Sequence, residues 1–96
     1  MPAFFVATVT IKDPQKFQDY ARKAGETFAA HGGEPVLRGK VEKALAGTAD
    51  HKTVGIIRFP SLDALSAWFN SDAYQAIVPL RDEAADVTIV AYSVPA

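Results

Sequence analysis

Three arginines, Arg38, Arg58 and Arg81, are the residues of this sequence best suited to hold a ligand. Arg58 shares one face of an alternating apolar segment with Val54 and Ile56. A guanidinium among apolar neighbours needs an anionic partner, because an unpaired buried charge is very costly. Its planar fork suits a carboxylate or a phosphate. Convergence of the arginines on one pocket would therefore predict a site for a small organic acid.

Each arginine also has a simpler interpretation. Arg58 could form an ion pair within or between subunits, or reach water from the end of a strand. Arg38 is expected on the same face as Val36, since side chains two apart in a strand point the same way. Arg81 closes a helical pattern, where it could instead donate hydrogen bonds to the last carbonyls of the helix.

His51 is the candidate for acid–base catalysis, because the pKa of histidine lies near neutrality. It follows Asp50 in a polar stretch, so the alternative is an ordinary solvated loop histidine. His31 precedes a Gly-Gly pair at a helix end, where the helix dipole favours a cation. The sequence has no motif such as H-E-x-x-H and no cysteine, and we predict neither a metal site nor a cofactor.

Large amphipathic side chains supply candidate walls for a pocket. Trp68 and Tyr74 are the leading two, followed by Tyr20 and Tyr92. Such residues surround a ligand with apolar surface, while the hydroxyls fix a polar group. At helical spacing, however, these residues more often belong to the core or to an interface.

Length and composition restrict the class of protein. We expect a single domain, 1–96, with a modest core. The net charge of −1 and the absence of a basic stripe argue against nucleic acid as a partner. The N-terminus lacks the pattern of a signal peptide, and no apolar run is long enough to cross a membrane. The default expectation is a soluble cytoplasmic protein.

Strand and helix patterns alternate along the chain. Residues 3–11 alternate as a strand does, and Asp13-Pro14 opens a helix that Gly32-Gly33 ends. Residues 35–38 and 44–47 are candidate short strands, and 48–52 is a polar loop. Further elements are a strand over 54–59, helices over 62–69 and 72–78, a disturbance at Pro79, and a strand over 87–94.

The order β-α-β-β-α-β predicts an α+β, ferredoxin-like fold with an antiparallel sheet and helices on one face only. The other face would carry Val6, Val54 and Ile56. An apolar face of this kind favours coverage by a second copy of the chain, in a homodimer.

A family resemblance runs through most of the sequence. The segments that carry it are Phe59-Pro60-Ser61 with Ala64 and Trp68, then Ser71, Tyr74-Gln75 and Leu80-Arg81, with Asp13-Pro14, Tyr20, Gly32-Gly33 and Arg38-Gly39 upstream. In this order and spacing the sequence resembles the domain-of-unknown-function 1330 family. The resemblance implies a dimeric α/β barrel, a superfamily that includes cofactor-free monooxygenases and a lactone isomerase. The chain departs from the family pattern at Lys40, Ala46 and Arg58, and the last two replace acidic residues.

These observations predict a homodimeric protein that binds a small organic molecule, with an organic acid as the first candidate. Arg38 and Arg58 would orient the ligand, and Trp68 and Tyr74 would wall the pocket. Any chemistry would be cofactor-free proton transfer or isomerisation through His51. Two alternatives are a non-catalytic dimeric module whose barrel is filled by its own side chains, and, by analogy with the superfamily, a cofactor-free monooxygenase.

Overall fold

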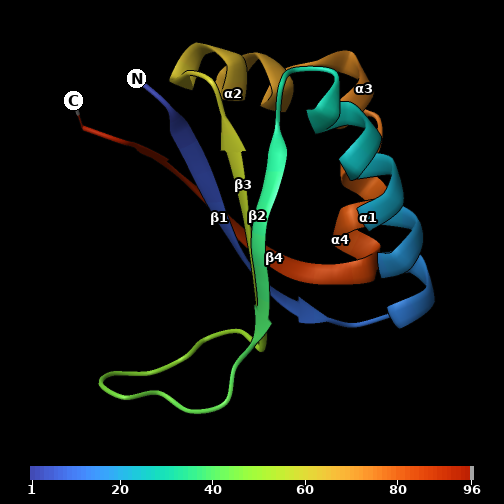
Figure 1. The fold of residues 1–96 in the computed structure, drawn as a ribbon. Coiled ribbons are helices and arrows are strands. Elements are labelled where there is room, and N and C mark those ends of the chain that lie inside the picture. Colours follow the sequence, from blue (N-terminus) through green and yellow to red (C-terminus); the bar gives the residue numbers. More distant parts are fainter. Residues whose placement is uncertain (96) are drawn as a thin grey trace.

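The protein is described by a computed structural model that covers residues 1–95. The elements follow in the order β1 (Ala3–Ile11), α1 (Pro14–Ala29), β2 (Glu34–Lys40), β3 (Thr53–Phe59), α2 (Leu62–Phe69), α3 (Asp72–Gln75), α4 (Val78–Ala84) and β4 (Ala85–Ser93). Figure 1 shows the sheet with all helices on one side and a long loop between β2 and β3 below it.

The four strands form one sheet in the order β2-β3-β1-β4, and every neighbouring pair is antiparallel. With helices on one face only, this is the predicted α+β, ferredoxin-like fold. On β1, Phe4 lies opposite Arg58 and Val6 lies opposite Ile56. These side chains occupy the face away from the helices, which we call the open face, as the alternation predicted.

The first helix begins and ends as the sequence predicted. The Asp13 carboxylate accepts hydrogen bonds from the backbone N–H groups of Gln15 and Lys16, both at 3.1 Å, and caps the helix. At the other end, Gly32 adopts a positive φ of 80°, and the N–H of Gly33 donates to the carbonyl of Phe28 at 2.8 Å. These caps fix the ends of the helix that lies over the sheet.

Two predicted elements are wrong. Residues 44–47 form no strand; they belong to the loop between β2 and β3, where the Leu45 side chain is 88% exposed. Apolar residues alone do not form a strand unless a neighbouring strand offers backbone hydrogen bonds. The helix predicted over 72–78 ends at Gln75, and Pro79 lies in the first turn of α4, where a missing N–H costs nothing.

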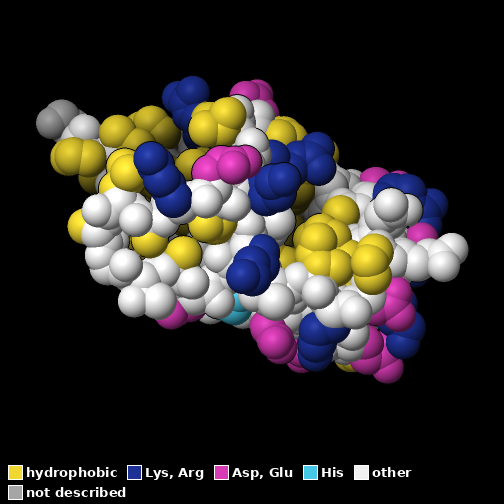
Figure 2. Space-filling model, turned by 90° about the horizontal axis from the view of Figure 1, so that it is seen from below, with side chains coloured by type: hydrophobic (Ala, Val, Ile, Leu, Met, Phe, Trp, Pro, Cys, Tyr) yellow, Lys and Arg dark blue, Asp and Glu magenta, His cyan; other side chains and the backbone are white. Residues whose placement is uncertain are grey.

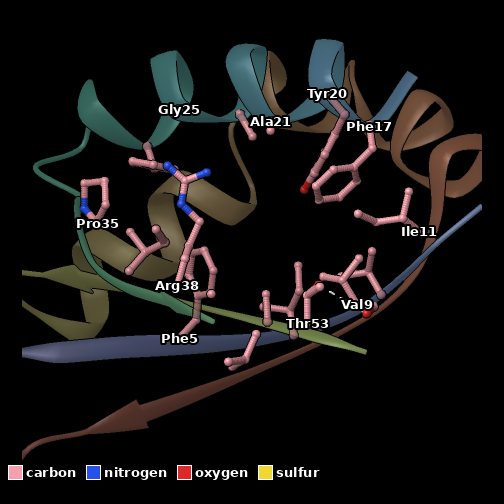
Figure 3. Close-up of a pocket in the computed structure, with 18 of the residues that line it drawn as sticks. Phe5, Val9, Ile11, Phe17, Tyr20, Ala21, Gly25, Pro35, Arg38 and Thr53 are labelled. Carbon is pink, nitrogen blue, oxygen red and sulfur yellow. Dashed lines mark hydrogen bonds between the residues drawn. The ribbon is translucent and has the colours of Figure 1, made fainter. Parts of the chain in front are cut away.

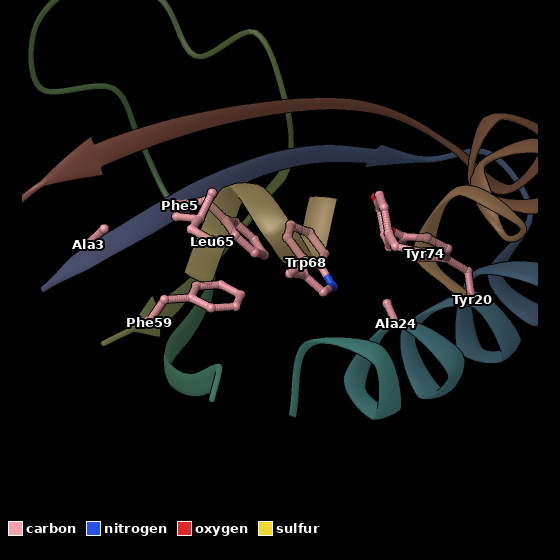
Figure 4. Packing of buried hydrophobic residues seen from close by; sticks show 8 residues of the cluster. All are labelled: Ala3, Phe5, Tyr20, Ala24, Phe59, Leu65, Trp68 and Tyr74. Atoms are coloured by element: carbon pink, nitrogen blue, oxygen red, sulfur yellow. The ribbon is translucent and has the colours of Figure 1, made fainter. Parts of the chain in front are cut away.

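The core lies between the helices and the sheet. Its largest fully buried side chains are Trp68, Tyr74 and Phe59. The Trp68 ring stacks on Phe5 with centroids 5.0 Å apart, and it packs against Tyr74 at 4.4 Å (Figure 4). These aromatic contacts dock α2 and α3 onto β1.

Within residues 1–95 no helix covers the open face of the sheet, and much of this face is apolar. Phe4 stacks on Tyr92 across β1 and β4 with ring centroids 5.1 Å apart, and Val6 lies opposite Val90. Leu37 of β2 continues this face and is 66% exposed.

Seen from below, apolar side chains reach the surface in separate groups with Lys and Arg side chains between them (Figure 2). Within residues 1–95, no helix combines the length and apolar character that crossing a membrane requires.

Candidate functional site

A cavity of about 610 Å³ lies between the sheet and α1 (Figure 3). Its floor consists of residues from β1, β3 and β4 that point toward the helices, among them Val9, Ile57 and Ile89. The roof comes from α1, and β2 forms one side through Pro35 and Arg38. The volume lies within the range that small-molecule sites occupy.

Small residues on α1 leave the space that this cavity fills. Ala21 and Gly25 lie about one turn apart on the side of α1 that faces the sheet, and both line the cavity. A glycine inside a helix costs about 1 kcal/mol relative to alanine. A methyl group on Gly25 would meet only the Phe28 ring, at an ordinary 3.9 Å, so close packing does not require the glycine. Glycine at position 25 therefore makes the protein less stable than alanine would, and it leaves the cavity wider.

Two arginines, Arg22 and Arg38, line the cavity, and Arg38 is the better placed to meet a ligand. Its side chain extends from β2 toward α1, so that the guanidinium points into the space between the sheet and the helix (Figure 3). Among residues 1–95, no carboxylate forms an ion pair with Arg38, whereas Arg22, the other arginine of the lining, lies 3.7 Å from Asp19. The Arg38 guanidinium is thus available to an anion.

A β-bulge gives Arg38 this direction. The pairing of β2 with β3 shifts between Pro35 and Leu37, so that Val36 is the additional residue. Before the shift Glu34 lies opposite Arg58, and after it Arg38 lies opposite Gly55. An extra residue reverses the face of every later side chain in the strand. The expectation that Arg38 shares a face with Val36 is therefore wrong.

Tyr20 carries a hydroxyl into the same cavity from α1 (Figure 3). Its Oη lies 2.8 Å from the Oη of Tyr74, which is fully buried, and the Arg81 guanidinium donates to Tyr74 Oη at 3.2 Å. Burial, reinforced by the neighbouring Tyr74, raises the pKa of Tyr20 well above its ordinary value. The Tyr20 hydroxyl therefore keeps its proton at neutral pH.

Tyr74 and Arg81 lie outside the cavity lining and are linked to it through Tyr20. Arg81 also contacts the Asp82 carboxylate, with Nε 3.3 Å from Oδ1. Neither Tyr74 nor Arg81 belongs to the cavity lining, so their contact with a ligand stays a sequence-based prediction. Through its hydrogen bond, Tyr74 instead holds the hydroxyl of Tyr20.

Trp68 belongs both to the core and to the wall of the cavity. Its ring is 1% exposed and lines the cavity, and its Nε1–H donates to Thr27 Oγ1 at 3.0 Å. Because the only indole donor is satisfied within the protein, Trp68 offers a ligand an apolar surface rather than a hydrogen bond.

Arg58 and His51 lie away from the cavity. Arg58 is on the open face and borders a separate shallow hollow with Glu34 and Pro60. His51 lies on the open face as well, with Nδ1 2.9 Å from Thr10 Oγ1 and Nε2 3.1 Å from Thr88 Oγ1. The prediction that Arg38 and Arg58 orient one ligand is wrong, because the sheet separates them.

Tyr20 and Gly25 are the residues whose importance the sequence conceals. The sequence makes Tyr20 a secondary candidate for the wall, and its helical spacing places it in the apolar stripe of α1. Nothing in the sequence shows that its hydroxyl meets that of Tyr74, fifty-four residues later. A glycine within a helical pattern is the signal that could have pointed to the cavity, since it costs stability there.

Comparisons with known proteins agree with the fold. A protein of unknown function from Rhodopseudomonas palustris superposes with a TM-score of 0.80 and 23% identity, covering 99% of this chain and 83% of that one. SnoaB, a cofactor-independent oxygenase from Streptomyces nogalater, gives 0.72 and 14%, with coverages of 99% and 94%. A dimeric ferredoxin-like protein of unknown function from Thermobifida fusca gives 0.66 and 13%, with coverages of 98% and 92%. At these identities the likeness concerns the fold.

No curated protein matches the sequence. One protein family does, and its description is "Domain of unknown function (DUF1330)". The match extends over residues 2–94, which is nearly the whole chain. The resemblance found in the sequence motifs is thereby confirmed, and the protein belongs to the DUF1330 family.

Proposed function

We propose that the protein binds a small, largely apolar organic acid in the cavity between the sheet and α1. The supporting observation is the direction of Arg38, which points into an apolar cavity without an ion-pair partner among residues 1–95. Apolar walls with a few placed polar groups are typical of small-molecule sites. A guanidinium at the side of such a cavity selects ligands that carry a carboxylate.

Binding without catalysis fits the chemistry of the lining. The lining residues include no histidine and no carboxylate among residues 1–95. Proton transfer needs a base whose pKa lies near the working pH. The raised pKa of Tyr20 makes its hydroxyl a poor base, and His51 lies on the other face of the sheet. We therefore assign no proton-transfer step to His51, and the ligand is held rather than converted.

A homodimer formed through the open face is part of this proposal. Two of the structurally similar proteins are dimeric ferredoxin-like proteins. In this chain the open face presents Phe4, Val6, Val90 and Tyr92 to solvent or to a partner. Two such sheets packed face to face would remove these side chains from water. The cavity lies on the opposite side of the sheet and would stay accessible in this dimer.

A second candidate function is cofactor-free oxygenation of an aromatic substrate. It draws on the resemblance of the fold to SnoaB and on the aromatic lining contributed by Phe5, Phe17 and Trp68. Oxygen consumption with quinol substrates, compared with boiled protein, tests it. Uptake above the boiled control would favour oxygenation over binding alone.

The test of the proposed binding function is calorimetric titration with para-benzoylbenzoate, a small aromatic carboxylate. We expect saturable binding, and Arg38→Met should weaken it by at least about tenfold, since a charge-assisted hydrogen bond contributes about 1.5–3 kcal/mol. Arg58→Met is the matched control, because it removes an equal charge on the neighbouring strand from the opposite face. Equal losses in both variants, or no binding by the unmodified protein, would contradict the proposal.

A further inference from the structure

The hydroxyl pair of Tyr20 and Tyr74 has a direction that the surrounding contacts determine. Tyr74 Oη has two neighbours, the Arg81 guanidinium at 3.2 Å and Tyr20 Oη at 2.8 Å. A guanidinium has no acceptor, so Arg81 donates and Tyr74 Oη accepts. The hydrogen on Tyr74 must then find an acceptor of its own.

Tyr20 Oη is the acceptor that remains. Tyr74 is fully buried, so water does not reach its hydroxyl, and among residues 1–95 its Oη makes no third hydrogen bond. If Tyr20 donated to Tyr74 instead, the Tyr74 hydrogen would be buried without a partner, which is a rare and costly arrangement. The favoured direction is Arg81 to Tyr74, and Tyr74 to Tyr20.

The Tyr20 hydrogen is left for the cavity. Within the described chain, Tyr20 Oη has no hydrogen-bond partner other than Tyr74, and Figure 3 shows the hydroxyl directed into the space between α1 and the sheet. Its oxygen is occupied by the donation from Tyr74, so what Tyr20 offers to the cavity is a donor. The raised pKa of Tyr20 is in keeping with a hydroxyl that retains this hydrogen.

We propose that Tyr20 is a specificity-determining residue that donates a hydrogen bond to a neutral oxygen acceptor of the ligand, such as a ketone or an ether. This inference rests on the proposed function, since it concerns the same cavity. Arg38 on β2 and Tyr20 on α1 then recognise two different groups, an anionic one and a neutral one. The ligand class becomes an apolar organic acid with a second, uncharged oxygen set in its apolar body.

The hydrogen-bond chain also explains why Tyr20 should prefer acceptors to donors. A ligand hydroxyl or amine directed at Tyr20 Oη would compete with Tyr74 for the lone pairs of Tyr20. Displacing Tyr74 would leave its buried hydrogen without an acceptor. Ligands that present only a donor at this point should therefore bind less well than ligands that present a carbonyl.

A matched pair of probes tests this assignment. Para-benzoylbenzoate has a ketone between its two rings, and para-benzylbenzoate has a methylene in the same place. In calorimetric titrations the unmodified protein should bind the ketone about fivefold more tightly than the methylene compound, the range expected of one neutral hydrogen bond. In Tyr20→Phe this preference should disappear, while the affinity for the methylene compound stays the same.

Tyr74→Phe distinguishes the two directions of the hydrogen bond. In the proposed direction Tyr20 already donates to the cavity, so Tyr74→Phe should leave the preference for the ketone within about twofold of that of the unmodified protein. In the reverse direction Tyr74→Phe would free the Tyr20 hydrogen and create a preference that was absent before.

The outcomes separate the two proposals. Binding that depends on Arg38 but shows no preference for the ketone overturns the role of Tyr20 and leaves the proposed function intact. A preference that persists in Tyr20→Phe also overturns it. Absence of binding by the unmodified protein overturns the proposed function, and the role of Tyr20 with it. Thermal midpoints of both variants confirm that each is folded.

Discussion

Arg38 and Arg58 lie on adjacent strands of one sheet and point to opposite sides of it. Arg38 lies opposite Gly55, and Arg58 follows Gly55 by three residues on the same strand, so the two guanidiniums face away from each other. Arg38 reaches the cavity under α1, and Arg58 belongs to the open face. One sheet thus presents a cation to the cavity on one side and a second cation to the open face on the other.

Gly25 offers a direct test that the cavity is the binding site. Gly25→Ala should raise the free energy of unfolding by about 0.5–1 kcal/mol, because alanine is favoured over glycine in a helix. Gly25→Leu should keep the fold and place a bulky side chain in the cavity. We expect Gly25→Leu to abolish binding of para-benzoylbenzoate and Gly25→Ala to retain it, with urea unfolding as the check on stability. Retained binding in Gly25→Leu would place the ligand elsewhere.

The effects of removing the Tyr20 and Tyr74 hydroxyls on stability should be coupled, because the two hydroxyls share one hydrogen bond. Tyr74→Phe leaves Arg81 Nη1 without its acceptor and should lower the free energy of unfolding by about 1–3 kcal/mol. Tyr20→Phe leaves the Tyr74 hydrogen unpaired and should cost a similar amount. The double variant should cost less than the sum of the two, because both single changes remove the same hydrogen bond. A double-mutant cycle by urea unfolding measures this coupling, and strict additivity would contradict it.

Stability should fall at alkaline pH in a way that depends on Tyr20. Its pKa is raised by burial in the folded state, whereas in the unfolded chain it lies near the reference value of about 10. Above that pH the unfolded chain loses the proton and the folded protein retains it, so deprotonation favours unfolding. The contribution is complete below about pH 10 and then declines by about 1.4 kcal/mol per pH unit.

The corresponding measurement is the unfolding free energy of the protein and of Tyr20→Phe between pH 8 and pH 11, about one unit or more on each side of the tyrosine reference value. The variant should show a smaller decline above pH 10, roughly where the reference tyrosine titrates. Parallel curves for the two proteins would show that Tyr20 does not keep its proton through burial.

The open face should control association. Val6 lies opposite both Ile56 and Val90, at the middle of this face. Val6→Asp would place a carboxylate in the proposed interface, and an unpaired buried charge is strongly destabilising. Light scattering after size exclusion should show a dimer for the unmodified protein and a monomer for Val6→Asp. Gln18→Glu adds the same charge on the exposed side of α1 and should leave the dimer unchanged; a monomeric unmodified protein would contradict the interface.

Much of the fold could be predicted from the sequence because alternation reports local geometry. The strand at residues 3–11 alternates clearly, and Asp13-Pro14 and Gly32-Gly33 mark the ends of α1 with residues suited to caps. The strand predicted over 44–47 is wrong because its apolar residues lie in an exposed loop and pair with no strand. Pro79 misled because proline ends one helix and begins another with equal ease.

The candidate site could be predicted less well, because it depends on contacts between distant segments. The sequence predicts that Arg38 orients a ligand, and this role stays a prediction. A one-residue bulge at Val36 turns Arg38 to the helix side of the sheet, where it lines the cavity, and nothing in the sequence indicates that bulge. The sequence predicts that Tyr74 walls the pocket, whereas in the structure its hydroxyl forms hydrogen bonds with Tyr20 and Arg81. The cavity itself arises where Ala21 and Gly25 lie over the sheet, which only the packing of α1 reveals.

Photo-crosslinking with para-benzoylbenzoate tests the central claim most directly, because the ketone of this probe inserts into nearby C–H bonds when irradiated. Digestion and mass spectrometry then locate the label. We predict labels on cavity residues of β1, α1 and β3, such as Val9, Ala21 and Ile57, and a marked decrease of these labels in Arg38→Met but not in Arg58→Met. Labels confined to residues of the open face, such as Val6 and Val90, would show that the ligand binds on the other side of the sheet and would contradict the account.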